Sequence, residues 1–174
     1  MVRMSILYII TKYITFPGAL LRCFWEQFMC KIGKVPIENN KCLQVNEMCG
    51  HIEHEIVDNK VKSFFNAFIP GLIVFIVGIT FLISPLINLG YLEISGTALK
   101  IVMYVMLYLA LSMLTNIFPS IEDAIVMWEN YKELKVSLKI LFSVGAVTMY
   151  VGAYLEKYSV TFFTNAIIAV LIIL

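Results

Sequence analysis

The stretch Phe65–Leu89, FNAFIPGLIVFIVGITFLISPLINL, decides the fold because it carries no charged side chain. A helix that crosses a bilayer needs about 20 mostly apolar residues, and Ile101–Phe118 is a second stretch of this kind. The whole chain agrees: 60% of its 174 residues are hydrophobic and 14% are charged, where soluble domains have about 25% charged residues. We therefore expect an integral membrane protein whose partner is the lipid bilayer in which it is embedded.

Two further apolar runs, Leu138–Leu155 and Val160–Leu174, follow a charged stretch and are separated by a polar turn at Glu156–Ser159. The first membrane segment, 1–33, is long and apolar with a break at Pro17-Gly18, and it contains four charged side chains, at Lys12, Arg22, Glu26 and Lys31. Proline interrupts helices, so this segment either spans once or doubles back. The sequence predicts an all-α integral membrane protein, a single membrane domain over 1–174 with four to five transmembrane helices at 1–33, 65–89, 101–118, 138–155 and 160–174.

The segment 34–61 is the most polar part of the chain and contains both histidines. Apolar and polar residues alternate around Gly50–Val57, which indicates a strand. We expect a short polar loop or β-hairpin at about 37–60, on the membrane surface.

Basic residues mark the cytoplasmic side of a membrane protein. Eight lysines lie in or beside two polar segments: Lys31, Lys34, Lys41, Lys60, Lys62, Lys132, Lys135 and Lys139. Only Arg3, Lys100 and Lys157 lie on the other side. The loops 31–63 and 119–139 are therefore predicted to be cytoplasmic. If so, Cys23, Cys30, Cys42 and Cys49 should be thiols. A formal charge of +1 indicates no nucleic-acid partner.

Three groups of residues are candidates for chemistry. In the first, helical spacing places Arg22, Cys23, Glu26 and Cys30 on one face of a helix. This face either contains an ion pair of Arg22 with Glu26 that satisfies both charges, or it forms the wall of a polar site. In the second, Pro119 ends a helix and Ser120 caps the next, in which Glu122 and Asp123 occupy the first turn; capping explains every residue there except Asn116. In the third, Cys42-x6-Cys49-x-His51-x2-His54 offers metal ligands without a structural zinc spacing, and equally suits a solvated hairpin.

Together these motifs resemble the intramembrane zinc metalloproteases of the site-2 protease class. That class has HExxH on one helix and N-x-x-P-x-x-x-x-D-G on a later one, whose Asp is a zinc ligand. Here 116–124 keeps Asn116, Pro119 and Asp123, with one residue fewer before the Asp and Ala124 in place of Gly. Residues 16–21 are similar to the Pro-Gly entry before HExxH in small prokaryotic relatives. Gly50-His51-Ile52-Glu53-His54 is similar to their Gly-aromatic-Val-x-His strand.

The HExxH position reads Arg22-Cys23-Phe24-Trp25-Glu26, so the two histidine ligands and the catalytic Glu of the class are missing. Arginine stays protonated and repels a cation. We therefore expect no zinc-dependent proteolysis, and the resemblance implies a structural ion cluster of Arg22, Glu26 and Asp123 in place of the metal.

The leading hypothesis is a non-catalytic membrane protein that resembles the site-2 proteases, needs no cofactor and binds or regulates a membrane protein or peptide along the strand Gly50-His51-Ile52-Glu53-His54. The first alternative is an active zinc metalloprotease with a non-standard site, whose ligands would come from Glu26, Cys49, His51, His54 and Asp123. The second alternative is a small structural or immunity-type membrane component.

Overall fold

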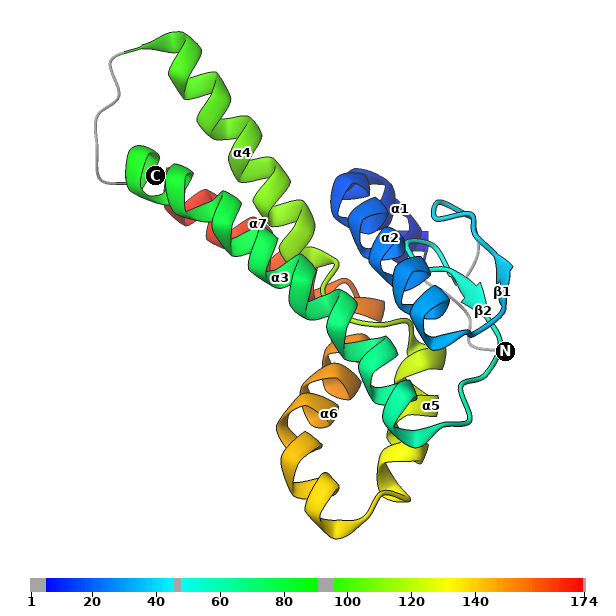
Figure 1. Ribbon diagram of the computed structural model, residues 1–174. Coiled ribbons are helices and arrows are strands. Elements are labelled where there is room, and N and C mark those ends of the chain that lie inside the picture. Colours follow the sequence, from blue (N-terminus) through cyan, green and yellow to red (C-terminus); the bar gives the residue numbers. More distant parts are fainter. Residues whose placement is uncertain (1–5, 46–47, 91–95, 174) are drawn as a thin grey trace.

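The computed structural model describes residues 6–45, 48–90 and 96–173, and this part of the chain is mostly helical (Figure 1). The helices are α1 (Ile6–Ile14), α2 (Phe16–Gly33), α3 (Lys60–Gly90), α4 (Thr97–Thr115), α5 (Ile121–Lys132), α6 (Val136–Lys157) and α7 (Val160–Ile173). The strands are β1 (Ile37–Asn39) and β2 (Glu53–His54). Arg3, used above in the count of basic residues, lies outside the described residues.

Helices α3, α4 and α6 are each long and apolar enough to cross a membrane. The pair α1 and α2 also meets this criterion, as a broken span or a re-entrant loop, and is bent by 92°. Helix α7 is apolar but shorter. These helices agree with the predicted all-α, membrane-like class. On α6, the side chains of Ile140, Leu141 and Val144 are each more than 70% exposed, which suits a helix face that contacts lipid.

The bend between α1 and α2 lies at Thr15, two residues before Pro17. Proline is well tolerated in the first turn of a helix, where its missing N–H has no helical acceptor to lose. Helix α2 ends at Gly33, and the next residue, Lys34, adopts a left-handed conformation with φ of 54°. Helices α1 and α2 are thus separate elements, and their junction brings Lys12 and Arg22 into the interior.

Helices α3 and α4 form an antiparallel hairpin, and α7 runs behind them in Figure 1. The N-terminal part of α3 packs with α5 and α6 around a core of Phe64, Ala67, Met127, Ala146 and Met149. Ser120 caps α5, and its hydroxyl accepts a hydrogen bond from the Asp123 amide at 3.1 Å, as the sequence predicts. The turn between α6 and α7 falls at Tyr158 and Ser159, also as predicted.

The polar segment between α2 and α3 contains a small antiparallel sheet in which Ile37 pairs with His54 and Asn39 with Glu53. The predicted β-structure is therefore present, although each strand is only two or three residues long. A disulfide joins Cys23 on α2 to Cys42 in the loop, with Cα atoms 5.8 Å apart. This bond differs from the expectation of free thiols, because the loop folds back onto α2 and brings the two residues within bonding range. Cys30 and Cys49 are free.

Candidate functional site

A network of buried charges lies where α1, α2, α6 and the polar loop meet. Its ionisable members are Lys12, Arg22, Glu26, His51 and Glu156, and each side chain is at most 5% exposed. Burying an unpaired charge is costly, so buried charges occur with partners. Two cations and two carboxylates balance here, and the histidine lies between the carboxylates.

Arg22 joins three parts of the chain. Its Nε donates to Glu26 Oε1 at 2.7 Å, its Nη2 donates to the carbonyl of Ala67 at 3.1 Å, and its Nη1 donates to the carbonyl of Ile117. A guanidinium group offers a rigid fork of five N–H donors, which suits this geometry. Gly71 on α3 provides the space, because a Cβ there would lie 2.6 Å from Arg22 Nη1.

Glu26 connects α2 to the polar loop. Its Oε1 lies 2.8 Å from His51 Nδ1, and its Oε2 accepts a hydrogen bond from the Ile52 amide at 3.3 Å. The adjacent Gly50 has a φ of +89°, and a Cβ there would lie 3.0 Å from Lys12 Cδ. Glycine therefore meets two demands at position 50, a left-handed backbone and close contact with Lys12.

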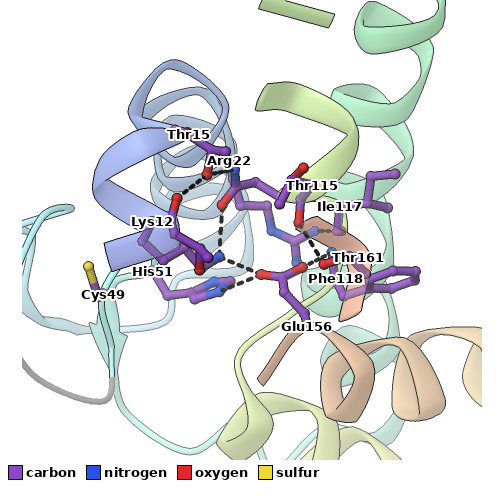
Figure 2. Close-up of polar contacts among 12 residues, drawn as sticks. Lys12, Thr15, Arg22, Cys49, His51, Thr115, Ile117, Phe118, Glu156 and Thr161 are labelled. Carbon is purple, nitrogen blue, oxygen red and sulfur yellow. Dashed lines mark hydrogen bonds and ion pairs between the residues drawn. The ribbon is translucent and has the colours of Figure 1, made fainter. Parts of the chain in front are cut away.

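Glu156, near the end of α6, forms the other half of the network. Figure 2 shows Lys12 and His51 pointing toward its carboxylate. Lys12 Nζ forms an ion pair with Glu156 Oε1, His51 Nε2 lies 3.8 Å from the same oxygen, and Glu156 Oε2 accepts from the Phe118 amide at 3.1 Å. Burial alone would lower the pKa of His51, but the charge of Glu26 and the contacts of His51 with the carboxylates of Glu156 and Glu26 together raise it.

Asn116 anchors this network to α4. Its Oδ1 accepts from Lys12 Nζ at 2.8 Å, and its amide donates to Thr15 Oγ1 at 2.9 Å and to the carbonyl of Ser112 at 2.8 Å. Asn116 is fully buried. These contacts explain the one residue of the 116–124 motif that helix capping leaves unexplained.

Asp123 lies apart from this network. Its Oδ1 is 3.2 Å from His54 Nε2, and its Oδ2 accepts from Ser120. The structure thus brings Arg22 and Glu26 together but gives Asp123 a different partner from the one in the expected ion cluster. The physical reason is that α5 directs Asp123 toward the sheet, while the remaining Arg22 donors bind carbonyl groups.

His54 is the second histidine partnered by a carboxylate. Its Nδ1 donates to the carbonyl of Glu55 at 2.8 Å, so Nε2 also needs a proton to pair with Asp123. Burial alone would lower the pKa of His54, but the Asp123 hydrogen bond and charge raise it to about 9. At neutral pH the pair is a salt bridge.

A cleft of about 390 Å³ adjoins this salt bridge, between β2, α3 and α5. Acidic side chains line it together with apolar ones: Glu38, Glu53, Glu122 and Asp123, beside Ile52, Ile56 and Val126. Of the predicted peptide-binding residues, Gly50, His51 and Ile52 are buried, and Glu53 and His54 form β2 at the cleft. The expected strand is therefore accessible only at its C-terminal part.

The structure separates the residues considered as metal ligands. Glu26 is with His51, Asp123 is with His54, and the backbone carbonyl of Cys49 accepts from Tyr8 at 3.1 Å. Within residues 6–45, 48–90 and 96–173, no three His, Cys, Asp or Glu side chains are arranged as a metal site. Cys23, at the catalytic Glu position of the resemblance, is bonded to Cys42.

Sequence reasoning missed Glu156 and did not connect it with Lys12. Lys12 carried a signal, because a charge inside an apolar segment requires a partner. That partner is 144 residues away and sits beside a polar turn, where a Glu needs no explanation. No family model, curated protein or solved structure matches this chain.

Proposed function

We propose that the chain is a non-catalytic, multi-pass membrane protein that binds an extended segment of a membrane partner in the cleft beside β2. The observation that carries this proposal is the cleft itself, of about 390 Å³, which is bounded by the short strand β2. An extended peptide can bind by lying alongside such a strand and forming main-chain hydrogen bonds with it. The excess of lysines favours a cytoplasmic position for the loops 31–63 and 119–139, whereas the disulfide of Cys23 with Cys42 is typical of a non-reducing compartment.

The buried charge network supports a non-catalytic role. In a distant relationship to the site-2 proteases, Arg22 and Glu26 would replace the two histidines of HExxH. Arg22 has no lone pair for a metal, and Glu26 is engaged by Arg22, His51 and the Ile52 amide. In this proposal the network connects α2 to α3 and to the polar loop in place of a metal.

The cleft combines backbone, apolar and charged features. Ile56 lines it and is 73% exposed, so a bound side chain would cover apolar surface there. The acidic side chains on β1, β2 and α5 favour a peptide with basic residues. Main-chain hydrogen bonds between the peptide and the strand would supply affinity, and the side chains that line the cleft would supply specificity.

A photo-cross-linking amino acid at Ile56 tests the proposal directly. The full chain in lipid nanodiscs is incubated with a library of extended peptides, and adducts are identified by mass spectrometry. The control places the same amino acid at Val45, which is 80% exposed and lies outside the cleft. We expect adducts with particular basic peptides from position 56 only.

A second test changes the peptide and leaves the protein unchanged. N-methylation of alternate backbone amides removes the donors that strand addition requires, so it should abolish the adducts. Equal cross-linking by methylated and unmethylated peptides would contradict binding along β2. Cleavage of the bound peptide that a zinc chelator blocks would contradict a non-catalytic role and favour the metalloprotease alternative.

A further inference from the structure

An apolar groove runs between the C-terminal end of α2 and the N-terminal end of α3, next to the cleft, with which it shares the lining residue Asn66. It has a volume of about 330 Å³ and is lined by Met29, Ile32, Val35, Phe65 and Ile69, with Lys62 at its edge. Ile32 is 61% exposed and Phe65 is 38% exposed. Both helices belong to segments that meet the criterion for membrane spans, and the exposed apolar side chains of the groove suit contact with hydrocarbon.

Basic side chains gather at the polar end of this groove. Lys62 Nζ is 3.4 Å from the carbonyl of Gly33, another lining residue. Lys31 lies two residues before Gly33, Lys34 directly follows it, and both lysines are exposed. Lys60 differs from them, because it is paired with Glu133 at 2.9 Å. An ammonium group has three N–H donors, so Lys62 retains capacity for an anionic oxygen.

From this combination we infer that the groove binds an anionic phospholipid, with one acyl chain between α2 and α3 and the phosphate group against Lys62 and Lys34. The argument is charge complementarity: an apolar slot that opens onto several lysines matches a molecule with an apolar chain and an anionic head. The positive N-terminal end of the α3 dipole lies at the same place and adds to the attraction. The inference is independent of the proposed peptide binding.

Trp25 is a built-in reporter for this groove. It lies on α2 four residues before Met29, which lines the groove, and residues four apart share a helix face. The other tryptophan, Trp128, stacks on Tyr131 and Tyr150 in the α5–α6 core. A Trp128→Phe variant therefore leaves a single tryptophan beside the groove.

The experiment measures quenching of Trp25 fluorescence by brominated lipids in phosphatidylcholine bilayers at low salt. Brominated phosphatidylglycerol and brominated phosphatidylcholine are compared at the same mole fraction. A lysine near the membrane surface contributes about fivefold to anionic lipid binding. We expect phosphatidylglycerol to be preferred by about that factor or more, and the preference to fall on adding salt.

The variant Lys34→Gln/Lys62→Gln removes the basic end of the groove, and Lys135→Gln is the matched control. Both lysines of the double variant are exposed, so their loss leaves the core intact. We expect the double variant to lose the preference and the control to keep it. Equal quenching of the Trp128→Phe protein by the two lipids, or a preference that survives in the double variant, would overturn the inference.

Native mass spectrometry of the unmodified protein from mixed phosphatidylglycerol and phosphatidylcholine micelles provides a second measurement. Retention of phosphatidylglycerol by the parent chain and its loss in the double variant support the site. Retention of both lipids in proportion to their supply would contradict it.

Discussion

At the scale of single residues, Glu26 illustrates how this protein accommodates charge in an apolar interior. Its two oxygens contact Arg22, His51 and the Ile52 amide, so both oxygens have nitrogen partners. A buried ion pair adds little stability compared with apolar residues of similar size, but removing one partner is severely destabilising. Each buried charge of the network therefore needs its partner for the protein to fold stably.

Replacing Glu26 by Gln should lower the free energy of unfolding by about 3–5 kcal/mol, because Arg22 then stays buried without its counter-charge. Unfolding by SDS in detergent micelles measures this loss. Glu133→Gln is the control, because Glu133 forms the exposed pair with Lys60 and should cause little change. If the two variants were equally stable, the network would have no structural role.

His54 should make stability depend on pH. Its pKa is raised from 6.5 in the unfolded chain to about 9 by Asp123, so folding favours the protonated form. The stabilisation is fully present below pH 6.5 and is lost as the pH rises to about 9. The difference in melting temperature between the parent protein and Asp123→Asn should shrink over this range. A difference that stayed constant from pH 6 to about 9.5 would refute this assignment.

At the scale of elements, the contact of α2 with α4 depends on Gly18. A Cβ at this position would lie 2.1 Å from the carbonyl oxygen of Ser112, and the Gly18 amide donates to Ser112 Oγ at 2.8 Å. Such close packing without side chains is typical of helix pairs in membranes. It holds the start of α2 where Arg22, one turn later, reaches α3.

Gly18→Ala should therefore destabilise the protein by about 1–3 kcal/mol, since the two backbones must move apart. The matched control is Gly33→Ala on the same helix, where the nearest atom to a new Cβ is Val35 Cγ2 at 3.4 Å. Unfolding by SDS compares the two. A Gly33→Ala variant less stable than Gly18→Ala would show that the α2–α4 crossing is looser than described.

At the scale of the whole molecule, the apolar runs of the sequence predict most of the helices, because hydrophobic length is a local property. The stretch 65–89 lies inside α3, and 101–118 overlaps α4. The ion pair of Arg22 with Glu26 could also be predicted, because the two residues are four apart on one helix. The sequence could not show that Lys12 meets Glu156 or that His54 meets Asp123, because these contacts depend on how distant segments pack. The disulfide of Cys23 with Cys42 depends on the same folding back of the loop.

The buried network joins segments that are far apart in the sequence. Arg22, Glu26 and His51 satisfy one another, and Lys12 with Glu156 closes the network from the other side. A cation added to this set would have to displace a lysine or an arginine, and both repel it. The central claim of the proposed function is that this network takes the place of a metal centre.

The most direct test is the zinc content of the protein purified in detergent, measured by elemental analysis beside His51→Ala and Asp123→Ala variants. The account predicts far less than one zinc ion per chain in all three proteins, with no difference between them. Nearly one zinc ion per chain in the parent protein, lost in either variant, would contradict it and make metal-dependent proteolysis the leading explanation.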